Sequence, residues 1–452
     1  MLRKGVALVL VVCCLLLSGC DYVGTSVDTL VRPPNLSEQQ EQIYDALETT
    51  VQPGSTLNLI SPENGSYRSA VILHNMDSEP TEEALAFYSA SSQSTMGDTG
   101  LRICLLDQIE GEWRAVWDIP GEGNDVDKVL FFTDHMTDHN YILIGFTPKE
   151  DGQQKTYCIY DYEVGSLQQC AVGEYQMLEA FDIDGDGQEE IITVSYQEEK
   201  SLVQDFSTTA TVTRVQQGQF IQSAPTVMAG KAISYNTVTK DQSSFGAPAL
   251  VIDEQVSKST YATEILIGAG DGLQNLIYQP GHDLYDQTMR TQVPISYDIN
   301  RDGIIEIPQT EYLPGYSLSS NSPLYLSKWY QLQDGTLKFT TLAYANYSQG
   351  YGLLLPSSWE GRVSATNLLQ NDELRFFVYH GDLEDQSEPI LSLKTETVSN
   401  IAVSGLPEGY FEVATIGQMV YLAKLYPVAD PALALTPEQV KSQFVEMYVT
   451  TD

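Results

Sequence analysis

The sequence predicts a mainly β protein, with an array of about five four-stranded repeats of about 54 residues each and a small C-terminal α+β domain. Three observations predict it. The 452 residues, 42% of them hydrophobic, are enough for an array plus one domain and too apolar for full disorder. From residue 55, short runs rich in Tyr and Val alternate with Gly turns, as β hairpins do. This regular pattern stops near residue 348.

The first twenty residues indicate the compartment. Arg3 and Lys4 precede an apolar run at 5–17, which is too short for a transmembrane helix but suits the core of a signal peptide. The run ends in Leu-Ser-Gly followed by Cys20, which resembles the lipobox of bacterial lipoproteins. The resemblance implies that residues 1–19 are removed, that Cys20 is lipidated, and that the protein is anchored on the outer face of a bacterial cell membrane. The alternative is an ordinary signal peptide with an incidental cysteine.

The charge balance excludes whole classes of partner. The chain has 23 Lys and Arg against 61 Asp and Glu, a formal net charge of −38. Nucleic acids and anionic lipid surfaces are bound by clustered cations, so we expect no nucleic-acid partner and no basic membrane-docking patch. The membrane contact is expected through the N-terminal lipid alone. Such an acidic surface also attracts divalent cations, which are plentiful outside cells.

Residues 20–54 are expected to form a lipidated tether and a short helix. The Pro pair at 33–34 stiffens the tether. The run 37–40 has the form of a capping box and predicts a helix over about 37–51. Apolar residues follow it at helical spacing: Ile43, Ala46 and Leu47.

Residues 55–347 carry the repeat. Hairpin turns recur at spacings of 54, 53, 54 and 63 residues, each with a glycine that accepts positive φ without strain. A repeat of this length in a β chain predicts β-propeller blades of four strands. An irregular β-sandwich with evenly spaced hairpins is the alternative. The turn glycines are Gly111, Gly165, Gly218, Gly272 and Gly335.

Residues 348–452 predict the small α+β domain. Strand-like runs lie at 373–380, 389–396, 410–415 and 418–426, and Thr436 is placed to cap a helix with Pro437 in its first turn. Three cysteines remain after the signal peptide and Cys20, and this odd number argues against a disulfide framework. Cys158 and Cys170 flank one hairpin turn and could form a bond, or else be small buried residues.

Segment 182–190 carries the sharpest chemical signal. With Asp182 counted as position 1, carboxylates stand at positions 1, 3, 5 and 9, and a glycine stands at position 6. A hard cation such as Ca²⁺ needs about six to eight oxygens, and this spacing lets one tight loop surround the ion. The candidate ligands are Asp182, Asp184, Asp186, the backbone carbonyl of Gln188, and Glu190.

The same spacing returns at 298–306, so a second calcium loop is predicted there. An EF-hand is disfavoured in both, because position 12 is Thr193 or Gln309 rather than Glu, and a β run follows the first loop. Turns without metal are the alternative, although close carboxylates repel one another in an empty loop. The candidate ligands of the second loop are Asp298, Asn300, Asp302, the backbone carbonyl of Ile304, and Glu306.

An Asp-x-Asp-Gly-Asp-Gly-x-x-Glu loop followed by an apolar strand resembles the FG-GAP/VCBS repeats of integrin α-type β-propellers. The resemblance spans about 60–345 and is most specific at 181–194. It implies blades that each hold a structural calcium ion near their first strand. Degenerate copies lie at 75–83, which lacks the glycine, and at 134–142, which keeps Asp134 and Asp138. In the first, third and fifth repeats the loop begins 36 or 37 residues before the hairpin glycine. In the fourth repeat, the residue 36 positions before Gly272 is Asn236, where the loop pattern is lost.

No enzyme signature accompanies these loops. His135 and His139 have the spacing of a helical zinc pair, but their β context favours a surface turn. The Gly-rich run 268–272 lacks the strand–helix context of a phosphate loop. The favoured function is a non-enzymatic surface lipoprotein whose calcium-stabilised propeller binds an unidentified extracellular protein or glycan. The alternatives are an exported carbohydrate-active enzyme on a propeller scaffold and a scaffold or sensor subunit of an envelope complex.

Overall fold

The computed structural model describes residues 38–447 apart from 54, 78, 93–96, 99, 135, 138, 150–153, 164–165, 199–205, 231, 280, 292–294 and 369–371. The predicted signal peptide at 1–19, the lipidation site Cys20 and the turn residue Gly165 lie outside the described residues. Within the described part, no helix is both long and apolar enough to cross a membrane.

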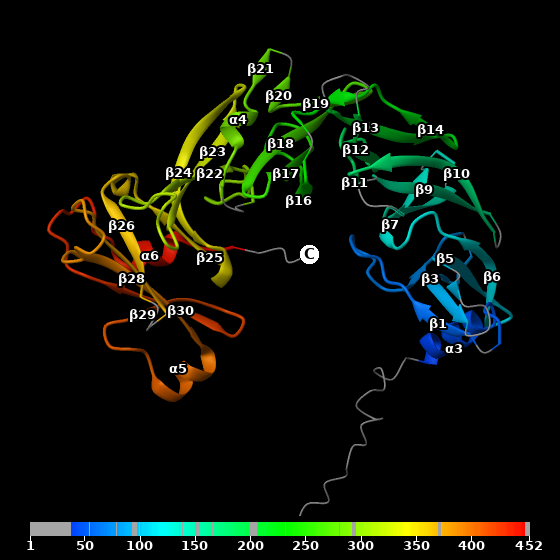
Figure 1. Ribbon diagram of the computed structural model, residues 1–452, viewed down its shortest axis with the longest axis horizontal. Coiled ribbons are helices and arrows are strands. Elements are labelled where there is room, and N and C mark those ends of the chain that lie inside the picture. Colours follow the sequence, from blue (N-terminus) through cyan, green and yellow to red (C-terminus); the bar gives the residue numbers. More distant parts are fainter. Residues whose placement is uncertain are drawn as a thin grey trace, which may run out of the picture.

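Six antiparallel sheets of four or more strands follow one another along an arc (Figure 1), which confirms the predicted mainly β array. The first holds β1 (Thr56–Leu59), β2 (Val71–His74), β3 (Glu83–Ser92), β4 (Gly97–Asp98), β5 (Arg102–Ile109) and β6 (Glu112–Pro120). The second holds β7 (Val126–Asp134), β8 (His139–Phe146), β9 (Lys155–Glu163) and β10 (Ser166–Tyr175). The third holds β11 (Met177–Phe181), β12 (Glu190–Glu198), β13 (Phe206–Gln216), β14 (Gln219–Gln222) and β15 (Thr226–Val227).

The fourth sheet holds β16 (Ser234–Asp241), β17 (Ala249–Ser257), β18 (Thr260–Ala269) and β19 (Gly272–Asn275). A hairpin of β20 (Tyr278–Gln279) and β21 (His282–Asp283) and a short helix, α4 (Tyr285–Thr288), follow it. The fifth sheet holds β22 (Ile307–Tyr312), β23 (Tyr325–Gln333), β24 (Thr336–Asn346), β25 (Tyr351–Leu355) and β31 (Phe444–Glu446). The sixth holds β26 (Val363–Leu368), β27 (Glu373–Val378), β28 (Pro389–Thr397), β29 (Phe411–Ile416) and β30 (Met419–Leu425).

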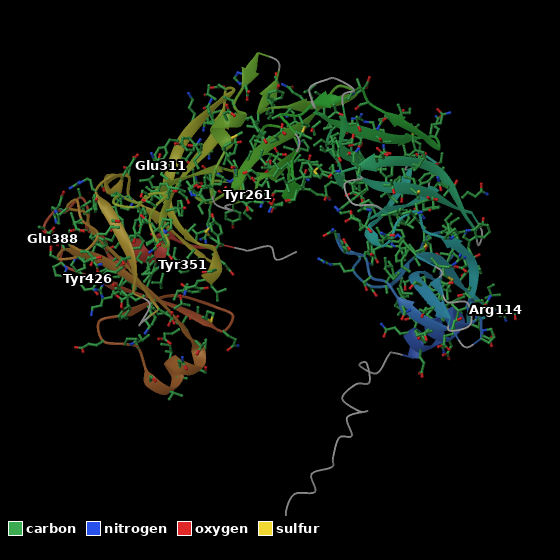
Figure 2. All side chains as sticks on the ribbon, in the orientation of Figure 1. Arg114, Tyr261, Glu311, Tyr351, Glu388 and Tyr426 are labelled. Carbon is green, nitrogen blue, oxygen red and sulfur yellow. The ribbon has the colours of Figure 1, made fainter. Side chains whose placement is uncertain are left out.

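Each sheet shares an apolar core with the next. The buried residues of the first and second sheets form one cluster, and the same holds for every following pair up to the fifth and sixth. Tyr351 lies in the last of these clusters, where the fifth and sixth sheets meet (Figure 2). Sheets that pack face to face in chain order are the arrangement that propeller blades adopt.

The predicted N-terminal helix is confirmed as α3 (Glu38–Glu48). Ile43 and Leu47 are buried against the first sheet, together with Ala46. Burying two large aliphatic side chains of this kind stabilises a helix's docking by about 3–6 kcal/mol. This contact fixes the point where the described chain enters the array.

The glycine turns have the predicted conformation in three repeats. Gly111, Gly218 and Gly335 have φ of 83°, 75° and 70°, and each follows a residue that also has positive φ, as two-residue hairpins require. In the fourth sheet the predicted turn, Asp271 with Gly272, is wrong by one residue. Gly272 begins β19 and pairs directly with Ala269, so the turn is made by Gly270, which has positive φ, and Asp271. The hairpin β20–β21 and α4, inserted before the fifth sheet, account for the longer last spacing.

The C-terminal part contains the predicted strands, as β27 to β30, together with two short helices, α5 (Val398–Ser404) and α6 (Pro437–Gln443). Thr436 caps α6 with the reciprocal bonds of a capping box. Two 3₁₀ turns, η1 (Tyr347–Gln349) and η2 (Ser357–Trp359), flank β25. Strand β25 pairs with both β24 and β31, so residues on either side of position 348 share the fifth sheet.

Among the described residues, the three cysteines, Cys104, Cys158 and Cys170, are free thiols. The disulfide considered between Cys158 and Cys170 is absent, because the strand register pairs Cys158 with Val172, and the thiol of Cys170 donates instead to the backbone carbonyl of Ile159 at 3.2 Å. Cys158 is instead a fully buried small residue in the core between the first and second sheets.

The fourth sheet buries two glutamates. Glu254 on β17 and Glu264 on β18 are both 0% exposed. The hydroxyl of Tyr285 donates to Glu254, while Glu264 accepts from the amide of Asn275 and, at 3.1 Å, from the backbone N–H of Ala229. Burial raises the pKa of both carboxyls, and the nearby Glu254 raises that of Glu264 further.

These raised pKa values predict a pH-dependent stability. The folded chain keeps protons that the unfolded chain releases near pH 4.5, so the free energy of unfolding should fall as pH rises from about 5 to 8. Glu264→Gln mimics the protonated side chain, and we expect it to stabilise the protein at pH 8 by an amount of the order of 1 kcal/mol. Urea unfolding at pH 6, 7 and 8 measures this, with the exposed Glu412→Gln as control. Equal effects of Glu264→Gln at all three pH values would contradict it.

Candidate metal centre

The two Asp-rich loops occupy equivalent places in their sheets. Segment 182–189 joins β11 to β12, and Phe181 pairs with Glu190 across its neck. In the fifth sheet, the first strand is reduced to a single bridge between Tyr297 and Glu306, which closes the second loop in the same way. The degenerate segment 75–83 is closed by His74 and Glu83. In all three loops, the residue just before position 1 therefore pairs with the glutamate at position 9.

A buried glutamate at position 9 anchors each loop from inside. One oxygen of Glu190 accepts the backbone N–H of Ile183 at 3.1 Å, and one oxygen of Glu306 accepts that of Ile299 at 3.0 Å. Glu83 accepts the N–H of Met76 at 2.7 Å. The glutamates are at most 3% exposed. The loop spacing alone predicts this glutamate only as a cation ligand, although the apolar residue at position 2 of all three loops signals the anchor.

The first loop wraps its backbone around one carboxylate. Asp182 accepts the N–H groups of Gly185 at 2.7 Å, Asp186 at 3.0 Å and Gly187 at 3.0 Å. Gly185 and Gly187 have φ of 78° and 92°, a conformation that residues with a Cβ rarely adopt. The turn therefore depends on both glycines.

The first loop draws three of its predicted ligands together. Asp182, Asp184 and Glu190 each offer an oxygen, and these oxygens all lie within 4.8 Å of one another. Two oxygens bound to one Ca²⁺ at about 2.4 Å are separated by about 4.8 Å at most, so the set fits such an ion. Asp186 instead accepts the N–H of Gln188 at 2.8 Å. The carbonyl of Gln188 as a further ligand stays a prediction.

A resident cation lies beside these carboxylates. Arg214 on β13 donates to Asp184 at 2.8 Å, its Nε lies 4.0 Å from Glu190, and its Nη1 donates to the carbonyl of Asp271 at 2.7 Å. Burial and the charge of Asp184 raise the pKa of Glu190 to about 7, although Arg214 opposes this. The sequence around the loop contains no sign of Arg214, because it comes from another strand.

The second loop has the same backbone but different side-chain contacts. Asp298 accepts the N–H groups of Asp302 at 3.0 Å and Gly303 at 2.9 Å, and Asp302 accepts that of Ile304 at 3.0 Å. The amide of Asn300 donates to Asp302 at 3.1 Å and to Glu306 at 2.6 Å.

The buried side chain of Gln331, from β23, completes the second loop. It donates to Asp302 and Glu306, both at 2.8 Å. Neutral amide donors therefore occupy the positions between these carboxylates. In the described part of this loop, no three acidic side chains converge as they do in the first. Burial raises the pKa of Glu306 to about 7.

The third loop, 75–83, has the least satisfied hydrogen bonding of the three. Glu83 Oε1 is buried and has no hydrogen-bond partner among the described residues, and burial raises the pKa of this carboxyl to about 7. Asp77 accepts the N–H of Glu79 at 2.7 Å, and Asn75 donates to the carbonyl of Glu79 at 2.8 Å. Position 78 lies outside the described residues.

The first two strands of the second and fourth sheets are joined by turns of other kinds. Asp134 accepts the N–H of Met136 at 2.9 Å and, from the third sheet, that of Gly218 at 2.9 Å. Asn236 lies inside β16, so the expected offset fails there; the turn follows Asp241, which accepts the N–H of Ser244 at 2.7 Å. His139 pairs with Asp161. His139 begins β8, whereas residues 135 and 138 lie outside the described part, so the surface turn expected at His135 stays a prediction.

Comparisons with known proteins do not assign a family. No protein-family model and no curated protein matches the chain. Among solved structures, a periplasmic gluconolactonase from Pseudomonas aeruginosa aligns with 13% identity and a TM-score of 0.25, covering 73% of this chain and 86% of that one. A GH43 β-1,3-galactosidase aligns with 9% identity and a TM-score of 0.27, covering 76% and 75%. Both TM-scores are below 0.5, so neither alignment enters the argument about fold or function.

The position of Arg214 predicts competition with a bound cation. Arg214→Gln removes a positive charge next to Asp184 while keeping a donor for Asp271. We expect the dissociation constant of the first loop for Ca²⁺ to fall by about three- to tenfold. Calorimetric titration in an Asp302→Asn background isolates the first loop, and Arg114→Gln removes a remote arginine as control. Unchanged or weaker binding would show that Arg214 organises the loop rather than competes.

Proposed function

We propose that the protein is a lipid-anchored binding module on the outer face of a bacterial cell membrane, with a propeller-like body stabilised by calcium. Cys20 would carry the lipid, since acyl chains anchor a protein by burying about 0.8 kcal/mol per CH₂ group. The partner would be an extracellular protein or glycan. The acidic composition supports a role that uses divalent cations and no nucleic acid.

The observation that carries this proposal is the converging set Asp182, Asp184 and Glu190. Three carboxylates in close contact repel one another, and burial together with the charge of Asp184 raises the pKa of Glu190. Ca²⁺ would let all three ionise while it is bound. Its role would be structural, because it would fix the turn between the first and second strands of the third sheet.

The resemblance to FG-GAP/VCBS repeats is part of the same proposal. It is supported by the place of the loops, each just before a buried strand, and by the repeated strand pairing at their necks. The second loop would bind more weakly, because Gln331 and Asn300 already satisfy its carboxylates. Calcium-binding loops of extracellular modules have dissociation constants of ~10⁻⁴–10⁻³ M.

Calcium should stabilise the purified protein against heat. A ligand at ten to one hundred times its Kd stabilises the folded state by about 1.4–2.7 kcal/mol, so about 10 mM Ca²⁺ after EDTA should raise the melting temperature by roughly 2–5 °C. Mg²⁺ should have little effect, because it demands a smaller octahedral site. Thermal melts followed by circular dichroism measure both.

The matched variant combines Asp184→Asn with Asp302→Asn. This double variant should lose the calcium-dependent rise in melting temperature. Glu311→Gln with Glu388→Gln removes two exposed carboxylates outside the loops and should keep it (Figure 2). If no calcium concentration shifts the melting temperature of the unmodified protein, the loops are turns without metal and the calcium part of the proposal fails.

Lipid attachment is tested separately. Cys20→Ser should move the protein from the membrane pellet to the soluble fraction and abolish incorporation of labelled palmitate in a bacterial host. A second variant, Cys170→Ser, removes a thiol from the body of the protein and should change neither result. Continued membrane association of Cys20→Ser would contradict the lipid anchor.

A further inference from the structure

A cavity of about 530 Å³ lies against the first strands of the second, third and fourth sheets. Figure 1 shows these strands, β7, β11 and β16, on the inner side of the arc. The segment 64–68 of the first sheet closes one side of the cavity. The cavity is separate from the Asp-rich loops. Its charged lining residues are Arg68, Asp127, Lys128, Lys155, Glu179 and Lys240.

The charge of this lining is opposite to that of the whole chain. The cavity has four cations against two carboxylates, whereas the chain has 23 basic and 61 acidic residues. Scattered basic residues in such a chain would not be expected to gather in one concave site. Since like charges repel, grouping them has an energetic cost that a bound anion removes.

The two carboxylates leave part of the positive charge uncompensated. Glu179 is shared by two lysines, with Lys128 at 2.5 Å and Lys240 at 3.5 Å. Lys155 pairs with Asp127 at 2.6 Å. The guanidinium of Arg68 donates to the backbone carbonyl of Glu63, which satisfies a hydrogen bond but carries no charge. Arg68 is exposed and the Lys240 side chain is 41% exposed, so both can turn toward a ligand.

The floor of the cavity is rigid. Asp127 also accepts the hydroxyl of Tyr175 at 2.6 Å and the amide of Asn64 at 2.8 Å. Gly145 makes room for Tyr175, since a Cβ there would lie 2.2 Å from the Tyr hydroxyl. Gly65, with φ of 85°, lies against the stem of Lys128. Asp127, Lys155 and Tyr175 are thus held in place before any ligand arrives, which lowers the entropic cost of binding.

We propose that this cavity is the binding site of the module and that its ligand is a small hydroxylated anion, either a sugar carboxylate or a sugar phosphate. The inference rests on the proposed binding function and adds its ligand class. The volume lies in the range of small-molecule sites. A large polyanion is disfavoured, because it would meet the acidic surface of the chain. Hydroxyl and amide groups in the lining suit sugar hydroxyls: Ser66, Gln176, Ser234, Asn236 and Thr237.

The ion pairs favour binding over catalysis at this site. A hydrolase would need a carboxyl that can donate a proton near neutral pH. Burial alone would raise the pKa of Asp127, but Lys155, Tyr175 and Asn64 outweigh it and lower that pKa. Asp127 is therefore held ionised.

The test is calorimetric titration of the full protein with three ligands that differ only at C6. D-glucuronate carries a carboxylate there, D-glucose 6-phosphate a phosphate and D-glucose a hydroxyl. We expect at least one anion to bind at least tenfold tighter than glucose, because each charge-assisted contact contributes about a tenfold factor. The binding should weaken as salt is raised. The stronger of the two anions identifies whether the ligand is a carboxylate or a phosphate.

The variant Arg68→Gln with Lys240→Gln should weaken binding of that anion by about a hundredfold. The matched control is Arg114→Gln with Lys258→Gln, which removes two exposed basic residues outside the cavity and should leave binding unchanged. Figure 2 shows Arg114 at the outer edge of the first sheet. Equal affinity for glucose and both anions, no binding of either anion at millimolar concentration, or unchanged anion binding in the cavity variant would overturn the proposal.

All titrations are run at 2 mM free Ca²⁺ beside a thermal melt of the same sample. A calcium-dependent melting temperature without anion binding overturns the cavity proposal alone. Anion binding that the cavity variant weakens, in a protein with no calcium response, supports the cavity and overturns only the calcium part of the proposed function. The cavity variant should keep the calcium response, because Arg68 and Lys240 contact none of the loop carboxylates.

Discussion

A buried glutamate that accepts a backbone N–H fixes how the chain turns into a strand at three places in the array. The bond spans seven residues in each case, from Met76 to Glu83, Ile183 to Glu190 and Ile299 to Glu306. A carboxylate inside a protein is expensive unless its oxygens are satisfied. The surrounding loop therefore has to supply donors or a cation, and the three loops do so differently. The first gathers acids beside an arginine, the second uses two amides, and the third leaves one oxygen without a partner in the described residues.

The hairpin turns, and the repeat length that they mark, could be predicted from the sequence because each turn depends on neighbouring residues. The hairpins at Gly111, Gly218 and Gly335, the helix α3 and the capped helix α6 all depend on residues a few positions apart. The mistakes arose where a shift of one or two residues matters. The spacing predicts a turn at Asp271 and Gly272, but the chain turns at Gly270 and Asp271, and the strand register places Cys158 opposite Val172 rather than Cys170.

The chemistry of the site was readable only in part. The positions of Asp182, Asp184 and Glu190 follow from the loop spacing, but Arg214 and Gln331 reach the loops from other strands. Pairing of distant strands decides such contacts, and no local pattern encodes it. The same is true of the basic cavity, whose lysines stand on strands of two different sheets, the second and the fourth. Its positive charge is invisible in a composition dominated by acidic residues.

Strand β31 gives the end of the chain a role in the order of folding. It pairs with β25, so the fifth sheet is completed by residues 444–446, after the sixth sheet has been synthesised. A chain is synthesised from its N-terminus, and the first four sheets contain no later segment among their described strands. Those four can form while the remainder is still being made. The fifth sheet must wait for β31, which the sixth sheet does not contain, so the sixth sheet can pair its own strands before the fifth sheet is closed.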